Sequence, residues 1–75
     1  GQRHRYDDAT AFVTSLERSQ LLRSDRTREH AIATVWLVTS PETFIQLTDG
    51  RRITLDEYEL WVEQTLSDAV LSQTT

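Results

Sequence analysis

The sequence contains no cysteine and no methionine, and all eight of its basic residues are arginine. Without cysteine the chain cannot form a disulfide, which is a common way of stabilising a small domain. The missing methionine at position 1 indicates processing, tag cleavage or an excised piece of a longer protein. We expect an excised piece.

Length and charge limit what this chain can do by itself. A domain of 75 residues buries only about 60% of the surface that its unfolded chain exposes, so its own core should be marginal. With disulfides excluded, a partner subunit is the leading way to add buried surface. The formal net charge of −4 opposes binding to a phosphate backbone, so we expect no nucleic-acid binding by this piece alone.

Several classes of function lack their usual signals in the sequence. There is no glycine-rich phosphate loop, no nucleophile elbow and no cysteine, so we expect no enzyme and no cofactor. His4 beside Asp7 and Asp8 is interpreted as a solvated polar group rather than a metal site, and His30 as a surface or interface residue. The most apolar stretch, residues 31–38, is far shorter than the roughly 20 residues of a membrane helix. We therefore expect a soluble, cytoplasmic domain without a membrane partner.

The first part of the chain predicts a helix over residues 7–20, preceded by a polar, flexible stub over residues 1–6. Four apolar residues share one face of that helix at i, i+3, i+4 and i+7: Ala9, Phe12, Val13 and Leu16. A polar joint follows, in which Ser24 or Asp25 is expected to cap the next helix.

A second helix is expected over residues 25–39, and it is apolar over most of its circumference. Such a helix must be covered on more than one side, and a chain this short has too little protein to do so. A buried strand containing Ile32, Val35 and Val38 is the alternative, because β-branched residues are common in this stretch.

Two further helices are predicted by their capping residues. Ser40-Pro41-Glu42 suits the start of a short helix reaching about Thr48, and Asp49-Gly50 suits a stop with a positive backbone dihedral. Thr54 and Glu57 form a capping-box pair at the start of the fourth helix, with Ile53 and Tyr58 as a hydrophobic staple.

The expected architecture is therefore a small, antiparallel, all-α domain of about four helices over residues 7–72, with a frayed end at residues 73–75. The second and fourth helices carry more apolar surface than one chain can cover, so we expect a homodimer in which they complete a four-helix bundle. The residues predicted to form this interface are Ala33, Trp36, Leu37, Leu60, Gln64, Ser67 and Leu71.

The segment from Ile32 to Leu66 resembles the last helices of tetracycline-repressor (TetR) family transcription factors. There, an apolar helix ends in a Leu-x-Thr-Ser-Pro-Glu-like turn, and an aromatic short helix, a polar loop and a Tyr-x-x-Trp helix follow. The matching residues here are Leu37, Thr39, Ser40, Pro41, Glu42, Phe44, Leu47, Tyr58, Trp61 and Leu66. The loop departs from the family pattern, since Gly50-Arg51-Arg52 stands where many members carry Gly-Trp.

The resemblance implies the C-terminal dimerisation and effector-sensing portion of a regulator, either repressor or activator, whose helix-turn-helix head is absent here. A small apolar effector is a possible ligand, and the aromatic residues expected to line its site are Phe12, Trp36 and Phe44. The alternative function is a stand-alone helical interaction module, such as an adaptor or antitoxin-like dimer. A DNA-binding helix-turn-helix over residues 41–66 is disfavoured, because its second helix is acidic.

Overall fold

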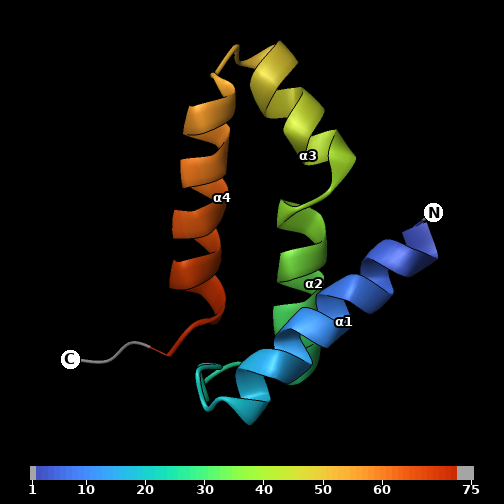
Figure 1. Cartoon of the computed structure of the whole chain (residues 1–75), viewed down its shortest axis with the longest axis vertical. Helices are drawn as coiled ribbons and strands as arrows, with labels where there is room; N and C mark the ends of the chain where they lie inside the picture. The colour runs from blue at the N-terminus through green and yellow to red at the C-terminus, as the bar shows by residue number, and fades with distance from the viewer. Residues whose placement is uncertain (1, 73–75) are drawn as a thin grey trace.

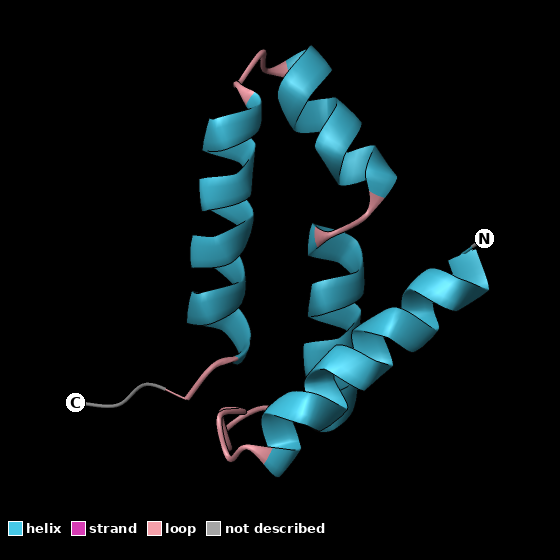
Figure 2. Cartoon of the chain, in the orientation of Figure 1, coloured by secondary structure: helices cyan, strands magenta, loops and turns pink. Residues whose placement is uncertain are grey.

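The computed structural model describes residues 2–72, and its regular structure is helical (Figures 1 and 2). The elements in chain order are α1 (Gln2–Arg18), α2 (Arg28–Val38), α3 (Pro41–Ile45), the π-helical turn η1 (Gln46–Gly50) and α4 (Leu55–Val70). No strand occurs within the described range, so the predicted all-α fold with four α-helices is confirmed. The strand alternative for residues 32–38 is wrong, because these residues lie within α2.

Helix α1 begins at Gln2, five residues before the expected start at Asp7. Residues 2–6, expected to be a stub, are therefore helical. Tertiary contacts explain the difference: Arg5 Nη2 donates to the Trp36 carbonyl at 3.1 Å, and the Arg5 guanidinium lies 5.7 Å from the Trp36 ring centroid. Tyr6 meets the same ring edge-on, with centroids 6.1 Å apart. The apolar period of α1 gives no information about these contacts with α2, so it could not predict the earlier start of the helix.

Helix α1 ends in a left-handed residue that is not glycine. Gln20 has φ 60°, and the amides of Gln20 and Leu21 donate to the carbonyls of Glu17 and Leu16. This is the hydrogen-bond pattern of a Schellman motif, which satisfies carbonyls that the helix end would otherwise leave unpaired. The chain then turns toward α2.

Thr27 caps the start of α2, which is later than the expected cap at Ser24 or Asp25. The Thr27 hydroxyl accepts from the His30 amide at 3.0 Å. Asp25 is engaged elsewhere, because Arg23 Nη2 donates to its carboxylate at 2.7 Å. This hydrogen bond lowers the pKa of the Asp25 carboxyl to about 2. The ion pair between Arg23 and Asp25 thus occupies the Asp25 carboxylate, which was one of the two side chains expected to cap α2.

The connection between α2 and α4 contains both expected and unexpected turns. Ser40 caps α3 as expected, accepting from the Thr43 amide at 3.1 Å. The helix does not end at Thr48, because η1 continues it to Gly50 with a wider turn. Gly50 does not have a positive φ; that conformation falls on Arg52, with φ 57°.

The capping box at the start of α4 is confirmed. Thr54 Oγ1 accepts from the Glu57 amide at 3.1 Å, and the Glu57 carboxylate accepts from the Thr54 amide at 2.8 Å. The hydrogen bond from the Thr54 amide, followed by the Thr54 side chain, lowers the pKa of the Glu57 carboxyl. A cap of this kind stabilises a helix by about 1 kcal/mol.

The other end of α4 is fastened to the α1–α2 loop. The Arg23 amide donates to the Val70 carbonyl at 2.9 Å, and the Ser72 amide donates to the Leu21 carbonyl at 2.7 Å. The Arg23 guanidinium adds a bond to the Asp68 carbonyl at 2.9 Å. We call this set of bonds the clasp. It fixes the position of α4 relative to the loop before α2.

The buried core lies at the clasp end of the molecule. It consists of residues from α1, α2 and the last turn of α4: Ala9, Val13, Leu16, Ala31, Ile32, Val35 and Val70. Figure 1 shows α1 crossing α2 at this end, while α3 and the start of α4 lie at the other. No residue from 41 to 69 is buried. The molecule measures 35 × 33 × 16 Å, so it is a slab about half as thick as it is wide.

Candidate ligand cleft and exposed apolar surface

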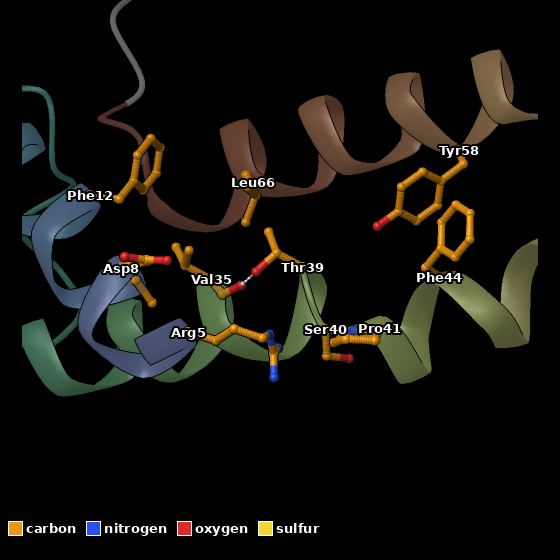
Figure 3. Close-up of a pocket in the computed structure, with 11 residues that line it drawn as sticks. Arg5, Asp8, Phe12, Val35, Thr39, Ser40, Pro41, Phe44, Tyr58 and Leu66 are labelled. Atoms are coloured by element: carbon orange, nitrogen blue, oxygen red, sulfur yellow. Dashed lines mark hydrogen bonds between the residues drawn. The ribbon is translucent and has the colours of Figure 1, made fainter. Parts of the chain in front are cut away.

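A cleft of about 600 Å³ opens where α1 faces the α2–α3 junction and α4 (Figure 3). Its volume is within the range of about 300–1,000 Å³ that holds small-molecule ligands. The residues that line it are Arg5, Asp8, Ala9, Phe12, Val35, Thr39, Ser40, Pro41, Phe44, Tyr58 and Leu66. They come from every α-helix, so the cleft exists only because the chain is folded.

One end of the cleft is an aromatic pair. Phe44 and Tyr58 meet edge-to-face, with ring centroids 5.0 Å apart and an interplanar angle of 88°. Figure 3 shows the Tyr58 hydroxyl on the side of the ring that faces Thr39. This end offers an apolar surface with one hydroxyl at its edge.

The polar groups of the cleft are few. Thr39 Oγ1 donates to the Val35 carbonyl at 2.7 Å, and the buried Ser40 hydroxyl caps α3, so both hydroxyls are engaged within the chain. The Arg5 guanidinium is held by Trp36. A mostly apolar wall with a small number of polar groups suits a small apolar molecule. Arg5 and Asp8 are the charged residues in the lining.

The three aromatic residues predicted to line a ligand site do not all meet. Phe12 and Phe44 line the cleft, whereas Trp36 does not. Trp36 packs against Arg5 and Tyr6, and its buried Nε1 has no hydrogen-bond partner within residues 2–72. Helical spacing alone could not show which of these three rings would line the cleft. Tyr58 was expected in the hydrophobic staple and in the Tyr-x-x-Trp motif, not in a ligand site, and it is a lining residue.

The residues predicted to form a dimer interface fall into two groups. Ala33, Leu37, Leu60 and Gln64 are exposed, and the exposed fractions of Leu37 and Leu60 are 57% and 54%. The others are half-buried within the chain: Trp36, Ser67 and Leu71.

Leu71 shows why the helical spacing misplaced part of that set. It lies beyond the last residue of α4, in an extended conformation, and pairs with Leu22. The period of α4 therefore does not apply to it, and Leu71 packs against the core.

The chain exposes more surface than a compact protein of its mass. Its accessible surface is 5604 Å², about 900 Å² above the roughly 4,700 Å² expected for 8.7 kDa. Its radius of gyration is 13.0 Å, against roughly 11 Å for a compact domain of this length. The large apolar side chains left exposed are Tyr6, Phe12, Leu21, Leu37, Phe44, Ile45, Leu55, Leu60 and Trp61.

The described residues form neither a metal-binding cluster nor a membrane-spanning helix. No cluster of three or more His, Asp or Glu side chains in the described range could hold a metal ion. None of the helices over residues 2–72 is both long and apolar enough to span a bilayer.

Comparison with known proteins gave no relative. The chain matches no protein-family model, no curated protein and no solved structure. Its function must therefore be argued from its own surface and cleft.

Proposed function

We propose that this chain is the dimerisation and effector-sensing portion of a TetR-like transcriptional regulator, working with a DNA-binding head supplied by the parent protein. The observation that carries the proposal is the large uncovered apolar surface of a slab-shaped, all-helical chain. Exposed apolar patches of several hundred Å² mark interaction sites. The described chain leaves nine large apolar side chains exposed, and its total accessible surface is about 900 Å² above that of a compact protein of its mass.

A second copy of the chain is the simplest cover for this surface. Homo-oligomers with two-fold symmetry are the commonest assemblies, and helices with exposed apolar faces pair into bundles. Leu37 on α2 and Leu60 on α4 are exposed, as a partner-facing position requires. Dimerisation would place two parent DNA-binding heads on two half-sites of an operator.

Dimerisation in this functional sense can be tested with a reporter. The chain would be fused to a phage-repressor head that binds its operator only as a dimer, and repression would be measured in cells. We expect repression by the fusion, and loss of repression with Leu60→Glu, since the glutamate would be desolvated without a partner. Leu21→Glu, at the clasp end, where the Leu21 side chain is 49% exposed, is the matched control and should still repress. A fusion that fails to repress while folded would refute the proposal.

The cleft supports effector sensing, and a neutral apolar dye tests it. N-phenyl-1-naphthylamine should bind the purified chain with enhanced fluorescence. Phe12 and Tyr6 are both 44% exposed on α1, but only Phe12 lines the cleft. Phe12→Ala should weaken dye binding about 10-fold or more, as expected for removing a phenyl contact, and Tyr6→Ala should leave it unchanged. Equal effects, or no dye binding, would favour the adaptor or antitoxin-like alternative, which needs no effector.

A further inference from the structure

The apolar cleft contains a carboxylate that pairs with no cation of the described chain. Asp8 lines the cleft from α1, is exposed, and takes part in no ion pair within residues 2–72. Phe12 follows one helical turn later, so the two side chains share one side of α1. Phe12 also lines the cleft, is 44% exposed, and pairs with no other ring in the described range. Figure 3 shows both residues at the end of the cleft opposite Phe44 and Tyr58.

The cation among the lining residues is already engaged. Arg5 Nη2 donates to the Trp36 carbonyl at 3.1 Å, and the guanidinium lies 5.7 Å from the centroid of the Trp36 ring. Trp36 is not a lining residue, so the Arg5 charge is directed at a residue outside the cleft. Figure 3 shows the guanidinium on the side of the cleft away from Leu66. Arg5 forms no ion pair with Asp8, although the two are three residues apart on α1.

The remaining walls suit the hydrocarbon part of an organic cation. Val35 and Leu66 line the middle of the cleft, and the Phe44–Tyr58 pair closes its far end. The face of an aromatic ring carries partial negative charge and attracts a cation. The net charge of the chain, −4, raises the local concentration of cations and lowers that of anions. Charge, rings and apolar walls therefore favour the same kind of ligand.

We propose that the cleft selects hydrophobic organic monocations. The positive charge lies between the Asp8 carboxylate and the Phe12 ring, and the hydrocarbon part of the ligand extends toward Phe44 and Tyr58. The inference rests on the proposed function and names the class of effector that the cleft senses. Asp8 is then the residue that determines specificity, because its charge is the one in the lining that is free to pair with a ligand.

Ligands of other charge fit less well. A hydrophobic anion would meet the Asp8 carboxylate, and it could pair with Arg5 only if the guanidinium left the Trp36 carbonyl. A neutral apolar molecule fills the same walls, but it covers the Asp8 carboxylate without supplying an opposite charge, which costs free energy of desolvation. A cation supplies that charge.

Two ions of the same shape and opposite charge test the proposal. Tetraphenylphosphonium and tetraphenylborate each carry phenyl groups around one central atom and differ in the sign of the charge. Isothermal titration calorimetry in sodium buffer should show that the wild type binds the phosphonium about 10-fold or more tightly than the borate. The neutral N-phenyl-1-naphthylamine, measured on the same preparation, reports whether the cleft takes apolar ligands at all.

Two variants locate the selectivity. Asp8→Asn should reduce the preference for the phosphonium about 3- to 10-fold, because it removes an attraction for one ion and a repulsion for the other. Phe12→Leu keeps an apolar side chain but removes the ring face, and should reduce the preference about 2- to 5-fold. Asp8→Glu keeps the charge and should retain most of the preference. Asp8 is exposed, so its variants should keep the wild-type circular dichroism spectrum.

Asp7→Asn is the matched control. It removes the same charge from the neighbouring exposed residue of α1, which does not line the cleft, so the preference should stay as in the wild type. An equal loss with Asp7→Asn and Asp8→Asn would overturn the cation site, as would a wild type that binds the naphthylamine without preferring the phosphonium. Both results would leave the proposed function standing. A folded wild type that binds none of the three probes would overturn effector sensing as well.

Discussion

Replacing Val13 with Asp should unfold the chain. Val13 is fully buried in the middle of α1 and belongs to the core shared with α2 and Val70. The substitution removes an apolar contact and places a carboxylate where no described group can pair with it, a cost of several kcal/mol. A domain of this size has a total stability of roughly 4–11 kcal/mol, at about 0.05–0.15 kcal/mol per residue. Circular dichroism at 25 °C should show loss of most helical signal.

The control for this substitution lies on the same helix. Ala11 is exposed on the opposite side of α1 from the core. Ala11→Asp adds the same charge to the same helix, so it should keep the wild-type spectrum and melting temperature within a few degrees. If Val13→Asp folded as well as Ala11→Asp, the packing of α1 on α2 would be wrong.

Diluting the wild type should lower its melting temperature. If folding and association are one event, a 100-fold dilution removes about 2.7 kcal/mol from the dimer. Two chains of 75 residues have an unfolding entropy of roughly 0.3 kcal/mol per kelvin. The expected shift is therefore about 9 °C, followed by circular dichroism at protein concentrations of about 1 and 100 µM.

A melting temperature that does not change with protein concentration would contradict coupled folding and association. It would show that the folded chain is stable without a partner over that range, and the exposed apolar side chains would need another explanation. The Leu60→Glu variant is the comparison. Its melting temperature should be lower than that of the wild type at both concentrations and should depend less on dilution.

The helices of this chain were predictable because their signals are local. Thr54 and Glu57 form the capping box that their spacing predicted, and Ser40 with Pro41 begins α3. Capping bonds join residues three positions apart, so sequence alone determines them. The core face of α1, including Val13, followed from the same short-range spacing.

The errors come from contacts between residues far apart in sequence. Arg5 and Tyr6 extend α1 because they meet Trp36, about thirty positions later. The same contact removes Trp36 from the cleft, where spacing had grouped it with Phe12 and Phe44. Leu71 left the predicted face of α4 because it pairs with Leu22. The apolar period of a single helix carries no information about contacts between residues of different helices.

The clasp has a consequence for how the two proposed sites communicate. Because α4 is held at its C-terminal end by Arg23 and Leu21, any movement of α4 relative to the core would be largest at its opposite end, which carries Tyr58. Tyr58 lines one side of the cleft, whereas Phe12 and Val35 line it from α1 and α2, so such a movement would change the width of the cleft. In the dimer that we propose, a ligand that preferred one width would change how tightly the two copies pair. By thermodynamic reciprocity, dimerisation would change the affinity for that ligand by the same factor.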